Sequence, residues 1–175
     1  MAFGKAFLLS IAAFVGLNFI FTITYYAIGP GFDALFSNIQ LYPLLILYYL
    51  FGSIISTPYI IFNYIVFQPI FVSFILETFL FWLGYLIAPI IAAILAGRFG
   101  ESKAQCFGAW TLTAVISTVS VIIAALLSPF TLTTLTTLYF LTSFDQLLIF
   151  AVISLVINML FYGFFALLLS KIEYY

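Results

Sequence analysis

The sequence predicts an all-α integral membrane protein, a polytopic helical bundle that forms a single transmembrane domain over residues 1–175. Three observations predict this class. Hydrophobic residues make up 67% of the chain, charged residues make up only 5%, and long apolar runs cover most of its length. Because a soluble domain needs roughly a quarter of its residues charged to keep a solvated surface, we expect lipid to be the solvent of this chain.

Four transmembrane helices are expected, at about residues 6–28, 70–97, 104–127 and 147–170. Each run is long enough to cross a hydrocarbon core about 30 Å thick. Each also ends at a glycine–proline turn or at a charge, which are the usual signals for the end of a helix. These are Gly29-Pro30-Gly31, the turn from Arg98 to Lys103, Ser128-Pro129 and Lys171.

A further apolar stretch, residues 41–67, has two interpretations because Ser56-Thr57-Pro58 interrupts it near its middle. One helix broken at Pro58 would make a fifth crossing, whereas two half-length helices would form a re-entrant or interfacial hairpin. Two separate crossings would give six in total. A six-helix chain of this length is similar, in size and hydropathy alone, to the substrate-binding membrane subunits of vitamin transporters. The sequence leaves four, five or six crossings open.

The basic residues favour the even count of four crossings. With four, Lys5, Arg98, Lys103 and Lys171 all fall on one side of the membrane, whereas five crossings split them three to one. The positive-inside rule assigns a side rich in Lys and Arg to the cytoplasm. We therefore expect both the amino and the carboxyl terminus in the cytoplasm.

The segment after the third span, residues 131–138, carries a leucine at every third position with threonines between them. This spacing places Leu132, Leu135 and Leu138 along one face of a short helix. We expect that helix to lie in the headgroup plane with its leucines turned towards the lipid.

A stripe of small residues runs along the second span at a spacing of four. It consists of Gly84, Ala88, Ala92 and Ala96. In lipid, helices associate through close backbone approach and interhelical hydrogen bonds, so the stripe predicts a helix-packing groove. Its occupant is either a helix of the same chain, the third span being the expected neighbour across the tight turn, or a helix of a partner subunit.

Polar side chains inside the apolar runs are the candidates for an intramembrane site, because such groups are costly there. Asn18 and Asn158 lie near the middles of the first and fourth spans, and Ser154 shares a helix face with Asn158. We expect the two amides to hydrogen-bond to each other as structural glue, or else to contact a solute. Glu77 is the only carboxylate inside a long apolar run, and it is expected near the outer boundary or at the mouth of a cavity.

The composition argues against catalysis, metals, cofactors and nucleic acid. The chain has no histidine, one cysteine (Cys106) and widely scattered acids, so we find no nucleophile–base pair, no carboxylate pair and no metal-ligand set. It also lacks the basic cluster that nucleic acid requires. The charged turn with Arg98, Glu101 and Lys103 is either a solvated helix cap or a docking site for a cytoplasmic partner.

The preferred functional hypothesis is a non-catalytic membrane subunit that packs within a larger membrane protein complex. The alternative is a small transport subunit or permease that binds a neutral or apolar solute near Asn18, Asn158, Glu77 and the break at Pro58, since transporters use discontinuous helices at such sites. A role in lipid interaction or membrane shaping, indicated by the threonine–leucine segment, is the third and least favoured hypothesis.

Overall fold

The fold is a bundle of four long helices, seen in a computed structural model that describes residues 2–170. Lys171, one of the basic residues used above for orientation, lies outside the described residues. The long helices are α1 (Ala2–Ile28), α6 (Leu76–Phe99), α7 (Lys103–Leu127) and α9 (Phe144–Leu168), and each is long and apolar enough to cross a membrane. No strand occurs within residues 2–170. The predicted class, an all-α multi-pass membrane protein, is confirmed.

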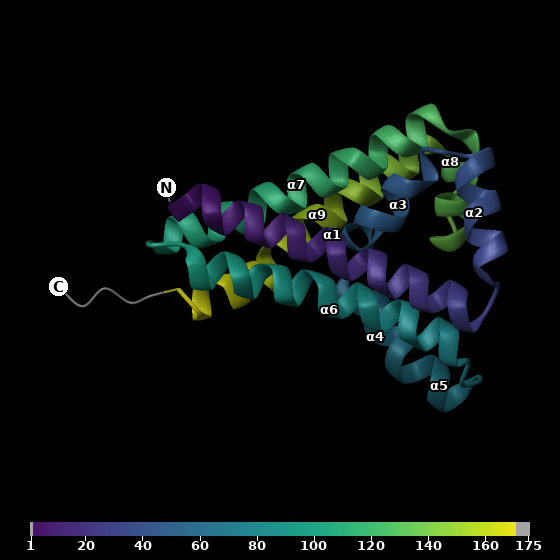
Figure 1. Cartoon of the computed structure of the whole chain (residues 1–175), viewed down its shortest axis with the longest axis horizontal. Coiled ribbons are helices and arrows are strands. Elements are labelled where there is room, and N and C mark those ends of the chain that lie inside the picture. The colour runs from purple at the N-terminus through teal and green to yellow at the C-terminus, as the bar shows by residue number, and fades with distance from the viewer. Residues whose placement is uncertain (1, 171–175) are drawn as a thin grey trace.

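The long helices lie side by side along the long axis, with the start of α1 and the end of α9 at the same end (Figure 1). We call this the terminal end, and the other the far end. The helix starts follow local chemistry: Ser102, Ser128 and Ser143 each accept a hydrogen bond from the backbone N–H three residues on. Such N-caps satisfy one of the free donors in the first helical turn.

Each long helix buries one narrow stripe and turns the rest of its surface outwards. In α1 the buried positions recur every fourth residue, and they are Ala6, Ser10, Phe14, Asn18, Thr22 and Tyr26. The exposed positions of α9 are mostly Leu, Ile, Val and Phe. This arrangement, with small and polar residues inside and large apolar residues outside, is typical of a helix bundle in lipid.

The helix pairing differs from the expectation that α6 and α7 form the rigid core. The most extensive contact of α6 is with α1, and α7 packs mainly on α9 and α1. A hydrogen bond from Thr113 Oγ1 to Ser10 Oγ (3.0 Å) joins α7 to α1. The helices α6 and α7 meet at the terminal end but diverge from there (Figure 1), because part of the broken segment contacts both of them.

The broken segment is the stretch that the sequence left open. It contains α3 (Leu45–Phe51), the 3₁₀ turn η1 (Gly52–Ile55), α4 (Pro58–Phe62), the π-helical turn η2 (Asn63–Phe67) and α5 (Gln68–Phe71). Its two arms, Leu45–Ile55 and Pro58–Phe71, are bent by 95° at the break. All residues from Gly52 to Pro58 are buried.

The preceding helix α2 (Phe32–Leu41) and the start of α6 both lie at the far end (Figure 1). The broken segment therefore enters the bundle and leaves it at the same end. The chain therefore has four long helices and one bent pair, which is either a re-entrant loop or a broken fifth span.

The short helix α8 (Pro129–Leu138) forms as expected, but the prediction that its leucines face lipid is wrong. Leu135 is completely buried, and Leu132 and Leu138 pack against the core. The reason is that α8 folds back over the far end, where it contacts α3, α7 and α9. Its leucines therefore pack against protein, while Thr133 and Thr137 stay exposed.

Candidate functional site

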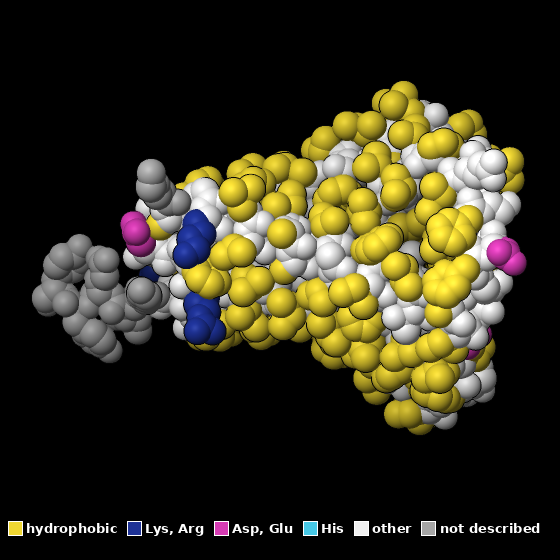
Figure 2. Space-filling model, in the orientation of Figure 1, with side chains coloured by type: hydrophobic (Ala, Val, Ile, Leu, Met, Phe, Trp, Pro, Cys, Tyr) yellow, Lys and Arg dark blue, Asp and Glu magenta, His cyan; other side chains and the backbone are white. Residues whose placement is uncertain are grey.

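The two ends of the bundle carry opposite charges among the described residues. Lys5, Arg98 and Lys103 lie at the terminal end together with Glu101, and Figure 2 shows the Lys and Arg side chains gathered there. The ammonium group of Lys5 lies 5.0 Å from the centre of the Phe99 ring. The acids Asp33, Glu77 and Asp145 belong to the first turns of α2, α6 and α9, which begin at the far end.

The predicted docking turn, Arg98 to Lys103, is an exposed connection that also caps a helix. The backbone N–H of Glu101 donates to Gln105 Oε1 (3.1 Å), and the backbone N–H of Gln105 donates to Ser102 Oγ (3.3 Å). Arg98, Glu101 and Lys103 have exposed side chains. The turn is thus an exposed connection that caps α7, and its docking of a partner stays a prediction.

The small-residue groove of α6 is filled by helices of the same chain. Ala88, Ala92 and Ala96 are completely buried, and Gly84 is buried beside them. A Cβ atom added to Gly84 would overlap the side chain of Phe21 in α1. The partner of the groove is therefore mainly α1, and not α7 as the tight turn predicted.

The prediction that Asn18 and Asn158 hydrogen-bond to each other is wrong, although both side chains are buried within the bundle. Asn18 Nδ2 donates to the Phe14 carbonyl (2.9 Å), which lies one turn back in its own helix. Asn158 Nδ2 donates instead to the carbonyls of Ile54 (2.6 Å) and Ser56 (3.1 Å) in the broken segment.

The break itself explains why Asn158 has these partners. A continuous helix would pair the Ile54 carbonyl with the N–H of residue 58, but residue 58 is proline and has no N–H. The Ile54 carbonyl would therefore stay unpaired in the interior, where such a group is costly. The amide of Asn158 supplies the missing donor.

Ser154 and Glu77 do not join the two asparagines in one site. Ser154 is completely buried one turn from Asn158, and its hydroxyl has no hydrogen-bond partner in the described part of the chain. Glu77 is partly exposed and lies against Gly29, in the first turn of α6. The four predicted residues are therefore spread along the bundle.

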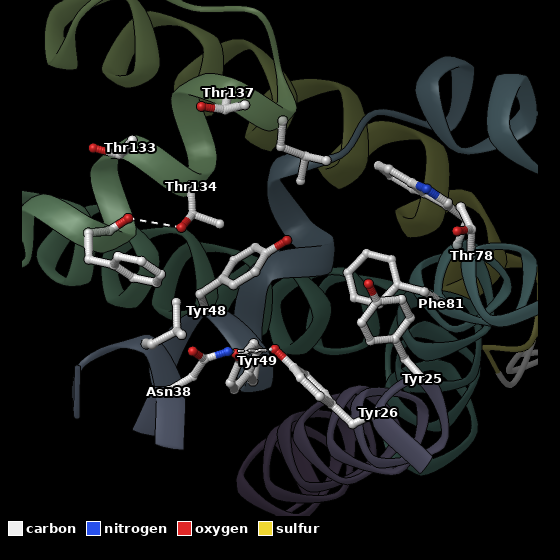
Figure 3. A pocket seen from close by; sticks show the side chains of 14 residues that line it. Tyr25, Tyr26, Asn38, Tyr48, Tyr49, Thr78, Phe81, Thr133, Thr134 and Thr137 are labelled. Carbon is white, nitrogen blue, oxygen red and sulfur yellow. Dashed lines mark hydrogen bonds between the residues drawn. The ribbon is translucent and has the colours of Figure 1, made fainter. Parts of the chain in front are cut away.

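A cavity with a volume of about 520 Å³ lies at the far end. Five helices form it: α1, α2, α3, α6 and α8. We call it the tyrosine pocket. Its lining residues are Tyr25, Tyr26, Asn38, Leu45, Tyr48, Tyr49, Thr78, Phe81, Trp82, Phe130, Thr133, Thr134, Thr137 and Leu138. Figure 3 shows α8 on one side of the pocket and α1 with α6 on the other.

Hydroxyl and amide groups meet on the wall formed by α1, α2 and α3. The hydroxyls of Tyr26 and Tyr49 are 2.6 Å apart, and Asn38 Nδ2 donates to the Tyr26 hydroxyl (3.3 Å) (Figure 3). Deeper in the bundle, Thr22 Oγ1 donates to the Tyr49 carbonyl (3.4 Å). These bonds join α1 and α2 to the first arm of the broken segment.

Tyr139, the residue that follows α8, also contacts the break. The hydroxyls of Tyr139 and Ser56 are 2.6 Å apart. Burial raises the pKa of Tyr139 well above its usual value of 10, so the phenol stays protonated and keeps a proton for this hydrogen bond. Asn158 and Tyr139 together fix the segment that presents Tyr48 and Tyr49 to the pocket.

Apart from Glu77, which neighbours the lining residue Thr78, sequence reasoning missed this site. The signals were present as the doublets Tyr25-Tyr26 and Tyr48-Tyr49 and as the threonine repeat of α8. Taken one at a time, tyrosines near span ends and a threonine–leucine helix indicate only the membrane interface. Their common position at the far end becomes visible only when the broken segment folds back.

The groups that line the pocket are aromatic rings, hydroxyls, one amide and aliphatic side chains. No charged side chain is among its lining residues, as far as the described residues go. Within residues 2–170, no group of three His, Cys, Asp or Glu residues is placed to hold a metal ion.

The fold and the pocket define a multi-pass helical membrane protein with a sharply bent, broken segment and an uncharged cavity at one end. Comparison of the chain with models of protein families, with curated proteins and with solved structures gives no match.

Proposed function

We propose that this protein is a small membrane transport protein, either a permease or a transport subunit, that binds a neutral small solute in the tyrosine pocket. The observation that carries the proposal is the pocket itself, with about 520 Å³ of space and an uncharged lining of aromatic and hydroxyl groups. Solute sites commonly have volumes of about 300–1,000 Å³ and combine apolar walls with a few polar groups.

The neutral character of the solute follows from the lining. A charged molecule would lose its hydration on entry, and only a partner of opposite charge would compensate for that loss. The lining residues offer hydroxyl, amide and aromatic groups. A neutral solute loses less on entry and can satisfy its polar groups on the hydroxyls.

The broken segment, whose first arm lines the pocket, also supports a transport role. Transporters build their substrate sites from discontinuous helices, whose broken ends expose backbone polar groups. Here the arm Leu45–Ile55 carries three lining residues, Leu45, Tyr48 and Tyr49. A movement at the break would therefore change the shape of the pocket.

The hypothesis that the sequence favoured, a non-catalytic subunit within a larger complex, loses its main argument, because α1 already fills the groove of α6. Association with other membrane subunits stays a prediction, and it would have to use another surface. The exposed turn with Arg98, Glu101 and Lys103 is one such surface.

We further propose that the terminal end faces the cytoplasm and that the tyrosine pocket lies towards the outer side. The support is the separation of charge, with Lys5, Arg98 and Lys103 at the terminal end and three acids at the far end. The positive-inside rule assigns the basic end to the cytoplasm.

Solute binding is tested with the purified protein in lipid nanodiscs. A set of neutral solutes and their charged analogues is screened by thermal stabilisation, and the hits are followed by uptake into proteoliposomes. Thr134→Trp should fill the pocket from α8 and abolish binding. Val119→Trp, at an exposed position of α7, is the matched control and should bind normally. Binding that survives Thr134→Trp would refute the pocket as the solute site, and a set without any hit would refute solute binding.

Orientation is tested with single cysteines and a membrane-impermeant maleimide on intact cells, in a Cys106→Ala background. Thr142→Cys and Ser73→Cys should be labelled from outside, because both positions are exposed loops of the far end. Glu101→Cys should be labelled only after lysis. Labelling of Ser73→Cys on the side opposite to Gln40→Cys, an exposed position that precedes the broken segment, would instead mean that the broken segment crosses the membrane.

A further inference from the structure

We infer that the solute is a neutral, planar ring compound with hydrogen-bonding groups on its edge, such as an aromatic lactam or a similar heterocycle. This inference rests on the proposed function and specifies its substrate class. Three features of the tyrosine pocket carry it: the kind of aromatic residue in the lining, the support of individual rings, and a free hydroxyl.

The first feature is the choice of aromatic residue. The chain contains 23 phenylalanines and 12 tyrosines, yet the pocket is lined by two phenylalanines and four tyrosines. A cavity that merely continued the lipid-facing surface would follow the overall composition and carry more phenylalanine. Tyrosine combines a flat apolar face with a polar tip. The lining is thus enriched in groups that contact a ring and its polar edge at once.

The second feature is that rings of the lining are held from outside. Tyr64 stacks on Trp82 with centroids 4.2 Å apart and planes 2° apart. Tyr42 stacks on Phe130 in the same way, at 3.9 Å and 1°. Neither Tyr64 nor Tyr42 lines the pocket. The two supported rings therefore present surfaces of fixed orientation. Binding of a planar solute to such rings costs less free energy than binding to mobile side chains, which must first be ordered.

The third feature is a hydroxyl that is free to meet a solute. Tyr26, Tyr49 and Asn38 bind one another. By contrast, the hydroxyl of Tyr25 points into the pocket and has no hydrogen-bond partner among residues 2–170 (Figure 3). A hydroxyl can donate and accept, so this group suits a solute edge that carries both an N–H and a carbonyl.

The inference is tested with three probes that share one bicyclic skeleton. They are 2-quinolone, which is planar and neutral, its fully saturated lactam, which keeps the N–H and carbonyl but is not planar, and quinoline-2-carboxylate, which is planar and anionic. Dissociation constants are measured by calorimetry on the protein in nanodiscs. We expect 2-quinolone to bind about tenfold more tightly than either of the other two, since a ring contact contributes roughly one factor of ten.

The variant Tyr25→Leu, which removes a ring and a hydroxyl from the pocket, should abolish the preference for 2-quinolone over the saturated lactam. Tyr59→Leu is the matched control, because Tyr59 is 79% exposed and does not line the pocket. It should keep the preference unchanged. Loss of the preference in both variants, or in neither, would overturn the assignment of the ring contact to this pocket.

The outcomes separate this inference from the proposed function. Equal affinities for 2-quinolone and its saturated lactam would overturn the planar class, while solute binding would stand. Tightest binding of the carboxylate would overturn the requirement for neutrality and, with it, the proposed neutral solute. If none of the three probes binds but another neutral solute of the screen does, only the planar class fails. If nothing binds at all, both fail.

Discussion

At the terminal end of the bundle, helices approach each other closely, whereas at the far end the same helices spread around a broken segment and a cavity. Near the terminal end, a Cβ atom added to Gly97 of α6 would overlap the backbone carbonyl of Ala166 in α9. Near the far end, α6 and α7 diverge and η1 contacts both of them, while the tyrosine pocket lies among α1, α2, α3, α6 and α8 (Figures 1 and 3).

The difference shows two ways to stabilise helices in a solvent that does not drive apolar groups together. Small residues allow backbones to come within van der Waals contact, and that contact fills space completely. A broken helix prevents such packing and leaves backbone carbonyls that need donors. Asn158 supplies donors to the carbonyls of Ile54 and Ser56, and Tyr139 binds the hydroxyl of Ser56. The far end, where the helices spread, keeps room for a solute.

The largest effect is expected from an added methyl group at the terminal end. Gly97→Ala should destabilise the protein by about 1–3 kcal/mol, because the new Cβ meets backbone atoms that cannot turn away. Gly16→Ala is the control, since a Cβ at Gly16 has no neighbouring atom within 4 Å. It should be neutral or slightly stabilising.

The measurement for this pair is unfolding in mixed micelles of increasing SDS fraction, monitored by tryptophan fluorescence. Equal stability of the two variants would contradict the close approach of α6 and α9 at Gly97.

The second comparison concerns the two buried asparagines. Asn158→Leu removes the donor to the carbonyls of Ile54 and Ser56, and we expect a loss of about 1–2 kcal/mol in stability. Asn18→Leu should cost less than about 0.5 kcal/mol, because Asn18 donates only to Phe14 one turn back in its own helix, and its Oδ1 has no partner among the described residues.

The same pair separates stability from binding. Asn158 lies outside the lining of the pocket but fixes the arm that carries Tyr48 and Tyr49. We therefore expect Asn158→Leu to weaken solute binding about tenfold even at temperatures where the variant is folded. The matched Asn18→Leu protein should bind normally. Normal binding by both variants would show that the break does not position the pocket.

The four spans could be predicted from the sequence because they depend on length and hydropathy alone, and a bilayer imposes both. The second span shows the limit of that argument. It was expected from residue 70, but α6 begins at Leu76, because the residues before it end the broken segment as α5 and a turn. Boundaries inside a continuous apolar run carry no hydropathy signal.

The helix pairing and the pocket could not be predicted in the same way, because they depend on contacts far apart in the chain. The sequence places Asn158 near the middle of a helix, but it does not identify the partner of its side chain. Finding that partner requires knowing that Pro58 leaves the Ile54 carbonyl free and that the break folds into the bundle. The tyrosine doublets of α1 and α3 likewise meet only through that fold.

The smallest effect on stability is expected from removing a single hydroxyl in each of the two regions. Tyr49→Phe removes one partner of the 2.6 Å contact with Tyr26 in the pocket wall, and it should cost about 0.5–1.5 kcal/mol. Tyr162→Phe in α9 removes a buried hydroxyl that has no hydrogen-bond partner among the described residues. That change should be neutral or slightly stabilising, because the unpaired group already carries its desolvation cost. Both are measured by the same SDS titration. A larger loss for Tyr162→Phe than for Tyr49→Phe would mean that hydrogen bonding does not distinguish the far end from the compactly packed part of the bundle.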